Sequence, residues 1–135
     1  MKILLVDDDE QVREAIVYAL MDNLYVKADQ IYQSWNGGQA LRIYDKHGPF
    51  DIVLTDNQMP VMNGIQFCQK LVKEDVQPMA IIMVTGCDRC ELDGLPRGVM
   101  HFNKRYPIAD LIGMLKNVYR PWDKVEKRTP PRTQF

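Results

Sequence analysis

Three aspartates stand directly after apolar runs, where a chain usually turns from a buried strand into a loop. Asp7 and Asp8 follow "KILLV" (2–6), and Asp56 follows "DIVLT" (51–55). A carboxylate at such a position loses hydration, and three of them close together would repel one another. A divalent cation removes that conflict, and Mg²⁺ prefers oxygen ligands while it keeps waters that a phosphate can displace. The three carboxylates are therefore candidate ligands of Mg²⁺ or Mn²⁺.

A hydroxyl and a cation follow two later apolar runs. Thr85 ends "MAIIMVT" (79–85), and Lys104 stands just past "VMHF" (99–102). Phosphoryl transfer needs a nucleophile, a metal and donors that stabilise charge on three phosphoryl oxygens while the attack is held in line. Asp56 is the candidate carboxylate nucleophile, with its charge compensated by the metal and by Lys104.

These residues need a scaffold that joins distant parts of the chain, and the hydrophobic pattern predicts one. Apolar runs alternate with amphipathic helical patterns. Strands are predicted over residues 2–6, 25–32, 51–55, 79–85 and 99–102, and helices over 10–21, 37–48, 64–74 and 108–119. Asp9 is suited to cap the first helix, and Gly48-Pro49 is expected to end the second.

Strands that are apolar throughout and alternate with helices predict an α/β fold. The arrangement is a three-layer doubly wound sheet of five parallel strands with right-handed crossovers. In such sheets ligands bind beyond the carboxyl ends of the strands. All five candidate residues would then converge on one edge of the sheet.

The composition is that of an ordinary single domain. The chain has 135 residues, of which 46% are hydrophobic and 26% charged, with a formal net charge of -1. That charge offers no basic field for direct nucleic-acid binding, and no apolar stretch approaches the length of a membrane span. Three cysteines, an odd number, fit a reducing compartment better than a disulfide framework. We therefore expect a cytoplasmic protein with neither a membrane nor a nucleic-acid partner.

The chain resembles the response-regulator receiver domain of two-component signalling from about residue 1 to residue 119. The resemblance rests on four motifs in the order of that family, "ILLVDDDEQVRE", "DIVLTDNQMPVMNG", "IIMVTG" and "HFNK". It implies a flavodoxin-like sheet with strand order 2-1-3-4-5. It also implies a bacterial protein, a monomer or weak dimer, that takes a phosphoryl group from a sensor histidine kinase or histidine phosphotransfer protein. Such a domain catalyses only its own phosphorylation and dephosphorylation, and a downstream protein, unknown here, reads its conformational switch.

The resemblance implies roles for the acidic residues. Asp56 resembles the phosphoacceptor of the family. Asp8 and Asp56 resemble direct metal ligands, the backbone carbonyl of Gln58 resembles a third ligand, and Asp7 resembles a residue that acts through water.

Further roles concern the bound phosphoryl group. Thr85 resembles the hydroxyl that is drawn to it, and Lys104 resembles its counter-ion. Gly86 would keep the approach open, as a small residue does there. Gln58 and Cys87 stand two positions after Asp56 and Thr85, where the family tunes the lifetime of the acyl phosphate.

Two departures from the family pattern surround Lys104. Receivers usually have a cis proline directly after this lysine, whereas here Arg105 follows and Pro107 comes three positions later. A cis bond before Arg105 would cost about 3 kcal/mol, so we expect a trans bond with a rearranged loop or a strained exception. The switch aromatic of the family falls on His101 or, with a shift of one position, on Phe102. His101 then either makes the switch pH-sensitive or is an ordinary half-exposed strand histidine.

The segment between the fourth and fifth strands is short for a full helix. The run "CDRCELDGLPRG" carries Gly94, Pro96 and Gly98, so that at most one or two helical turns fit before Pro96. We predict a shortened or irregular fourth helix, which puts the usual dimerisation face of the family in question. Cys87 and Cys90 form a C-x-x-C, and without a second pair they are interpreted as unpaired thiols rather than a redox or zinc motif.

Two other functions compete with a phosphorylated receiver. A degenerate receiver would act as a phosphorylation-independent binding module, as the odd fourth helix and the missing Lys-Pro suggest. A phosphatase of the haloacid dehalogenase type would use the D-x-D within "VDDDEQ". The motif of that family has Thr or Val at the position of Gln11, and such a phosphatase would leave Asp56 without a role.

The domain is predicted to occupy residues 1–119. The tail "RPWDKVEKRTPPRTQF" (120–135) holds five basic and two acidic residues and three prolines. It is interpreted as a flexible extension, with a solvated terminus, contact with an acidic partner and the start of a linker all left open.

Overall fold

The computed structural model describes residues 1–73, 78, 80–86 and 92–118. Its sheet has five parallel strands in the order β2-β1-β3-β4-β5. They are β1 (Ile3–Val6), β2 (Ile31–Ser34), β3 (Ile52–Thr55), β4 (Ala80–Thr85) and β5 (Met100–Asn103). The predicted three-layer α/β fold and its strand order are confirmed.

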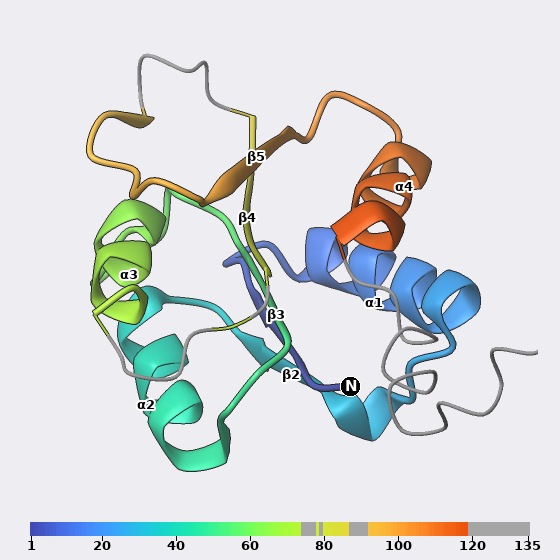
Figure 1. Cartoon of the computed structure of the whole chain (residues 1–135), viewed down its shortest axis with the longest axis horizontal. Coiled ribbons are helices and arrows are strands. Elements are labelled where there is room, and N and C mark those ends of the chain that lie inside the picture. The colour runs from blue at the N-terminus through green and yellow to red at the C-terminus, as the bar shows by residue number, and fades with distance from the viewer. Residues whose placement is uncertain (74–77, 79, 87–91, 119–135) are drawn as a thin grey trace, which may run out of the picture.

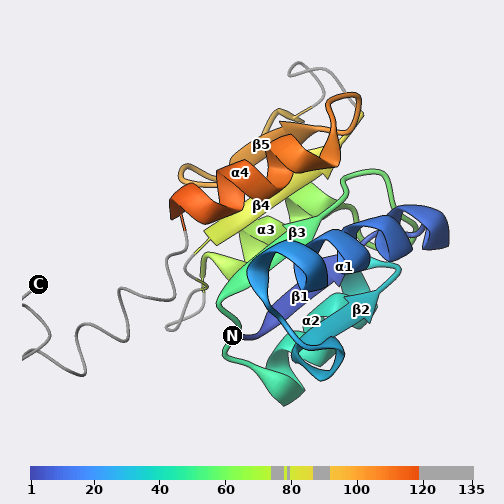
Figure 2. The same cartoon turned by 90° about the vertical axis from the view of Figure 1, so that its right-hand side faces the viewer.

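Helices cover both faces of the sheet. The helices are α1 (Glu10–Leu24), α2 (Gly37–His47), α3 (Gly64–Leu71) and α4 (Ile108–Val118), with a short 3₁₀ helix at Ala28–Gln30. Helices α1 and α4 lie side by side on one face, and α2 and α3 lie on the other (Figures 1 and 2). Among the described residues, no helix combines the length and the apolar character that a membrane crossing requires.

Alternation along each strand divides the core into two clusters. In β1, Ile3 and Leu5 pack toward α1 and α4, whereas Leu4 and Val6 pack toward α2 and α3. Successive strand side chains point to opposite faces, and helices cover both faces, which is why every residue of β1, β3 and β4 is buried. Burying each such side chain contributes roughly 1.5–3 kcal/mol.

Short polar side chains cap the N-termini of helices at the carboxyl edge of the sheet. Asp9 caps α1 as predicted, because its Oδ1 accepts hydrogen bonds from the backbone N–H groups of Gln11 at 2.9 Å and Val12 at 3.4 Å. Asn36 caps α2 and Asn63 caps α3 in the same manner. The caps fix where the chain leaves each strand and therefore where the loops of that edge lie.

The predicted strand over 25–32 is only partly correct. Helix α1 runs on to Leu24 and ends at Tyr25, which has φ 56° and the left-handed conformation of many helix caps. The chain then forms the 3₁₀ turn, and strand pairing begins only at Ile31, opposite Ile3. The polar residues Lys27 and Asp29 occupy this exposed turn, so that only residues 31–34 form β2.

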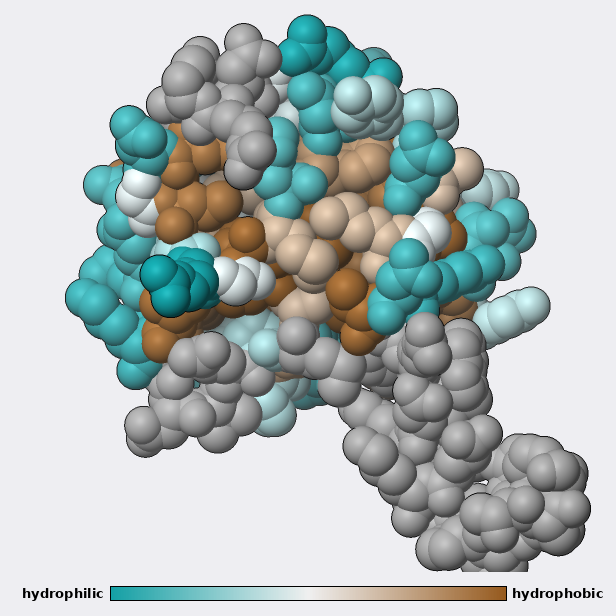
Figure 3. Space-filling view, turned by 45° about the horizontal axis from the view of Figure 1, so that its top comes forward, coloured by the Kyte–Doolittle hydropathy of each residue, from teal (hydrophilic) through white to brown (hydrophobic). Residues whose placement is uncertain are grey.

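The prediction of a shortened or irregular fourth helix concerns the connection between β4 and β5, of which residues 87–91 lie outside the described part of the structure. Residues 86 and 92–99, the part of this connection that the structure describes, contain no α-helix. Gly94 and Gly98 have φ values of 90° and 93°, a region that favours glycine. Apolar side chains are visible on the side of the molecule that lies at the top of Figure 1, where β5 forms the edge of the sheet (Figure 3).

Several predictions concern residues that the structure does not describe. They are the roles of Cys87 and Cys90, the helical end at Tyr119 and the character of the tail over 120–135.

Candidate functional site

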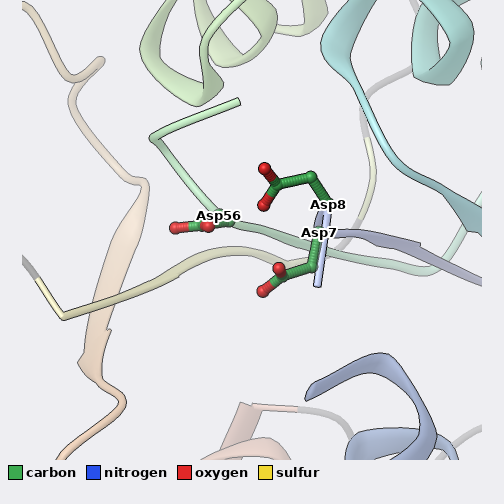
Figure 4. A group of neighbouring side chains, drawn as sticks. All are labelled: Asp7, Asp8 and Asp56. Atoms are coloured by element: carbon green, nitrogen blue, oxygen red, sulfur yellow. The ribbon is translucent and has the colours of Figure 1, made fainter. Parts of the chain in front are cut away.

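Three carboxylates gather at the carboxyl edge of β1 and β3. Asp7 and Asp8 follow β1 directly, Asp56 follows β3, and the register pairs Val6 with Thr55 at the ends of these neighbouring strands. One carboxylate oxygen of each aspartate lies within 4.8 Å of the corresponding oxygens of the other two. The three side chains point to the same side of the strand ends (Figure 4). Asp7 and Asp56 are buried and Asp8 is exposed, so the cluster is open to solvent on one side.

The cluster has the chemistry of a divalent-cation site. Buried carboxylates that face one another are stabilised by a hard cation with oxygen ligands, and Mg²⁺ typically takes a few carboxylates and keeps several waters. The predicted convergence of Asp7, Asp8 and Asp56 is thus present in the structure. The backbone of Gln58 lies in the loop two residues beyond Asp56, and its side chain is exposed. The role of the Gln58 carbonyl as a ligand stays a prediction.

Lys104 bridges the two buried aspartates. Its Nζ lies 2.8 Å from Oδ2 of Asp7 and 3.2 Å from Oδ2 of Asp56. Its backbone N–H donates to the carbonyl of Thr85 at 3.1 Å, which anchors the residue at the end of β5 beside β4. Burial lowers the pKa of Lys104, but its hydrogen bond to Asp7 and the charges of Asp56 and Asp7 outweigh that effect and raise it. Lys104 is therefore a protonated cation that already faces the proposed nucleophile.

Asp7 is an unfavourable place for a charge in the absence of a metal. Burial is the largest effect and raises the pKa of Asp7, and the charge of Asp56 raises it further. The hydrogen bonds from Lys104 and from the backbone N–H of Asp9, together with the charge of Lys104, act in the opposite direction without cancelling the rise. A divalent cation would add to the positive charge of Lys104 and so stabilise the Asp7 carboxylate.

Asp56 is held in a fixed orientation by its own loop. Its Oδ1 accepts a hydrogen bond from the backbone N–H of Asn57 at 2.7 Å, which leaves Oδ2 toward Lys104. The buried side chain of Asn57 in turn accepts from the backbone N–H of Ile65 at 3.1 Å and so ties the loop to the start of α3. A Cβ on Gly64 would lie 2.1 Å from the carbonyl oxygen of Asp56, so only glycine fits there. Asn57 was not predicted as a site residue, because it has no distinctive motif of its own.

The hydroxyl and the small residue of β4 stand at the same edge. Thr85 is the last residue of β4 and is buried. The register pairs Thr55 with Met83, so Thr85 lies two residues further along the edge than Thr55, the residue that precedes Asp56. Gly86 is exposed, and no atom of the described residues lies within 4 Å of the place that a Cβ would take. The described part of the chain therefore leaves space beside Gly86.

The bond after Lys104 is trans. Among the described residues, the cis peptide bond is Gly48–Pro49. The alternative of a trans bond with a rearranged loop is thus the one observed. Oδ1 of Asn103 accepts from the backbone N–H of Arg105 at 2.9 Å, and its carbonyl accepts from the N–H of Tyr106 at 3.0 Å. This turn holds Lys104 in place without the proline.

The two candidates for the switch aromatic lie on opposite faces of β5. Phe102 is buried in the cluster beneath α1 and α4, and its ring centroid lies 6.5 Å from that of Tyr106. His101 is half-buried and, by strand alternation, points to the other face. A cleft of about 250 Å³ adjoins Lys104 between α1 and α4, with Phe102 and Ile108 among its lining residues. The exposed Tyr106 also lines this cleft and was not singled out from the sequence.

Comparison with known proteins decides what kind of domain carries this site. The family model described as the response regulator receiver domain matches residues 3–112. The chain belongs to the response regulator receiver domain family. This membership favours the receiver interpretation over a haloacid dehalogenase-type phosphatase.

Similar receivers include proteins of different length. The chain is 32% identical over 127 residues to the probable transcriptional regulator ycf27 of Porphyra purpurea, covering 92% of this chain and 49% of that protein. It is 30% identical over 118 residues to sporulation initiation phosphotransferase F of Bacillus subtilis, covering 85% of this chain and 90% of that protein. This receiver thus spans about half the length of the ycf27 proteins but most of the length of the sporulation protein.

Solved structures share the fold of this receiver. A two component transcriptional regulator AraC from Clostridium phytofermentans matches with a TM-score of 0.71 and 28% identity, covering 87% of this chain and 90% of that one. The response regulator TrrA of Thermotoga maritima, solved in complex with Mg²⁺ and BeF, matches with a TM-score of 0.71 and 24% identity. That match covers 88% of this chain and 100% of the TrrA chain.

Proposed function

We propose that this receiver accepts a phosphoryl group on Asp56 in a reaction that depends on Mg²⁺ or Mn²⁺, and that it signals by the resulting change of conformation. The observation that carries the proposal is the contact of one lysine with two buried aspartates inside a cluster of three carboxylates. The family membership and the Mg²⁺-bound TrrA structure, which shares this fold, support it.

The carboxylates of Asp7, Asp8 and Asp56, with the carbonyl of Gln58, would hold the metal ion. When bound, the ion neutralises negative charge on the phosphoryl oxygens and on the carboxylates around them. The donor set fits this role because it consists of hard oxygen ligands on a rigid strand edge.

The chemical step follows from the orientation of Asp56. An oxygen of the Asp56 carboxylate attacks the phosphorus of a phosphohistidine, a P–O bond forms, and the P–N bond breaks with its electron pair passing to the imidazole. Lys104, already protonated beside Oδ2 of Asp56, stabilises the charge that develops on the phosphoryl oxygens. The Thr85 hydroxyl then donates to a phosphoryl oxygen of the acyl phosphate.

Release of the phosphoryl group resets the switch. Water attacks the phosphorus of the acyl phosphate, the bond from phosphorus to the Asp56 oxygen breaks, and inorganic phosphate leaves, which regenerates the carboxylate. Gln58, Gly86 and Cys87 set the rate of this step, as their positions in the family pattern imply. The chain acts on no other substrate. His101 or Phe102 responds to the movement of Thr85 and transmits the change of state to the surface.

The partner that donates the phosphoryl group is a sensor histidine kinase or a histidine phosphotransfer protein. The similarity to a sporulation initiation phosphotransferase supports a place in such a relay. The cleft between α1 and α4 offers this partner an apolar surface directly beside Lys104. We place the receiver in the cytoplasm, as a monomer or weak dimer, with its downstream target unidentified.

Beryllium fluoride, a mimic of a bound phosphoryl group, tests this proposal without a partner. We expect Mg²⁺ and beryllium fluoride together to raise the unfolding temperature by more than the sum of their separate effects, because each completes the site for the other. Asp56→Asn should abolish this synergy, whereas Asp45→Asn, which alters an exposed acid on α2, should retain it. No synergy in the unaltered chain would show instead a degenerate, phosphorylation-independent binding module.

A further inference from the structure

The outer side of α1 carries an exposed stripe of aromatic and acidic residues. Tyr18 is 80% exposed, Met21 41% and Tyr25 90%, although the other large apolar side chains of α1 are buried or half-buried. Tyr18 and Met21 are three residues apart and are therefore neighbours on the surface of α1, and Tyr25 caps the helix four residues after Met21. Half of the described large apolar residues that are exposed therefore belong to this one stripe.

Acidic side chains lie in the same stripe. Glu14 and Asp22 stand four residues before and four residues after Tyr18, so the three side chains form one row along the helix surface. The exposed charges of α1 itself are all acidic, since Arg13 is half-buried and donates a hydrogen bond to the carbonyl of Asp7. The stripe fits a segment that combines cationic and aromatic side chains.

The chain itself supplies such a segment. Residues 120–128, "RPWDKVEKR", combine one large aromatic side chain with four cationic ones. The aromatic residue is Trp122, and the cations are Arg120, Lys124, Lys127 and Arg128. They follow directly on α4, and α1 and α4 start at the same edge of the parallel sheet and lie side by side (Figures 1 and 2). Val118 and Leu24, near the last residues of the two helices, both pack against the same core cluster. The described end of α4 therefore lies at the same end of this helical layer as the carboxyl-terminal end of the stripe (Figure 2).

The length of the segment suffices to cover the stripe. Nine residues reach about 30 Å when extended, whereas the rise from Glu14 to Tyr25 along a helix is about 16 Å. Exposed ion pairs are individually weak, but a short tether holds the segment at an effective concentration in the millimolar range. A contact of millimolar affinity is therefore enough to keep the segment docked in about half of the molecules.

We propose that residues 120–128 dock on this stripe of α1 within the same molecule, with Trp122 against the exposed aromatic side chains and the cations against Glu14 and Asp22. The docked segment covers an apolar surface that would otherwise be open to solvent. This inference is independent of the proposed phosphorylation, because none of these residues belongs to the carboxylate cluster.

Fluorescence of Trp122 tests the docking in the full chain. The chain has two tryptophans, so the Trp35→Phe background leaves Trp122 as the sole emitter. At low salt, we expect the acrylamide quenching constant to be at least about twofold smaller than in the same chain carrying Tyr18→Ser and Tyr25→Ser. Glu14→Gln with Asp22→Asn, or about 0.5 M salt, should also raise the constant, because both weaken the charge contacts. Asp45→Asn on α2 is the matched control and should leave it unchanged.

Two results would overturn the proposal. One is a quenching constant that is the same in all of these variants, which would mean that Trp122 is equally open to solvent in each. The other is protection that disappears on dilution, which would assign the stripe to a second copy of the chain. Zero-length carbodiimide cross-linking of the unaltered chain gives an independent check. Peptides that join Lys124 or Lys127 to Glu14 or Asp22 should be found in the monomer, and their absence there would contradict the docking.

Discussion

The charge on Asp7 opposes folding when no metal is present. Burial raises the pKa of Asp7, and Asp56 adds to this rise. A carboxyl whose pKa is higher in the folded state than in the unfolded state favours folding at pH values below the unfolded-state pKa, and this contribution is lost as the pH rises through the folded-state pKa. At neutral pH, Asp7→Asn should therefore raise the free energy of unfolding of the metal-free protein.

Urea unfolding in a chelator measures this effect. The gain from Asp7→Asn should shrink as the pH is lowered from 7 toward the ordinary aspartate value of about 3.9, because Asp7 itself then becomes neutral. Saturating Mg²⁺ should reverse the order and favour the unaltered chain. A variant that is less stable than the unaltered chain at neutral pH, or a gain that does not change with pH, would contradict this account of Asp7.

Cys68 should be chemically inert in the folded protein. Its side chain is fully buried in α3, and burial raises the pKa of its thiol to about 12. At pH 8 only about one thiol in ten thousand would be ionised, and the thiolate is the nucleophile. Peptide mapping after iodoacetamide treatment should find Cys68 unmodified in the native chain and fully modified in guanidinium. Rapid modification of Cys68 in the native chain would contradict its buried position.

Individual residues of the site differ in how well the sequence predicts them. Asp7, Asp8 and Asp56 were predicted because they follow apolar runs, and parallel strands bring the ends of such runs together. The contact of Lys104 with both buried aspartates depends on the turn at Asn103, and nothing in the local sequence indicates that turn. The positive φ of 71° at the exposed Val61 was likewise not predicted, since valine rarely adopts it.

Among the secondary-structure elements, the start of α2 positions the loop that follows β3. The backbone N–H of Gly37 donates to the carbonyl of Met62 at 3.2 Å. A Cβ on Gly37 would lie only 2.6 Å from that carbonyl oxygen, whereas one on Gly38 would lie 3.3 Å from a methyl carbon of Val61. These neighbouring glycines therefore offer a matched pair of variants.

Gly37→Ala should destabilise the protein by about 1–3 kcal/mol, because backbone must move to admit the methyl group. The displaced loop carries Gln58, so the affinity for Mg²⁺ should fall as well. Gly38→Ala should change stability by less than about 1 kcal/mol, since a side chain can yield and alanine favours a helix. Thermal unfolding and Mg²⁺ titration compare the two. Equal effects of both variants would show that the approach of α2 to this loop does not position the site.

Elements with strong periodicity were predicted better than irregular ones. The helices at 37–48 and 108–119 and the apolar strands lie within a few residues of their predicted places. The strand at 25–32 was misplaced because Tyr25 and Val26 look like strand residues, although Tyr25 caps α1 and Val26 packs into the core. The pairing that starts β2 at Ile31 is a tertiary contact, which local propensity does not contain.

For the chain as a whole, the order of motifs predicted the fold and the family, and the structure and the comparisons confirm both. The doubly wound sheet follows from apolar strands that alternate with amphipathic helices, and it places every strand end that carries a polar residue at one edge. The surface stripe of α1 was not predicted, because exposure depends on which side of the helix the rest of the fold leaves uncovered.

Intact-mass measurement after incubation with acetyl phosphate and Mg²⁺ tests the central claim most directly, namely that Asp7, Asp8, Asp56, Thr85 and Lys104 form one phosphoryl-accepting site. We expect the unaltered chain to gain about 80 Da, which is the mass of one phosphoryl group. The gain should vanish in a chelator or with Asp56→Asn, and Asp45→Asn should retain it. An unaltered chain that gains no such mass, or an Asp56→Asn variant that gains it equally well, would contradict the claim.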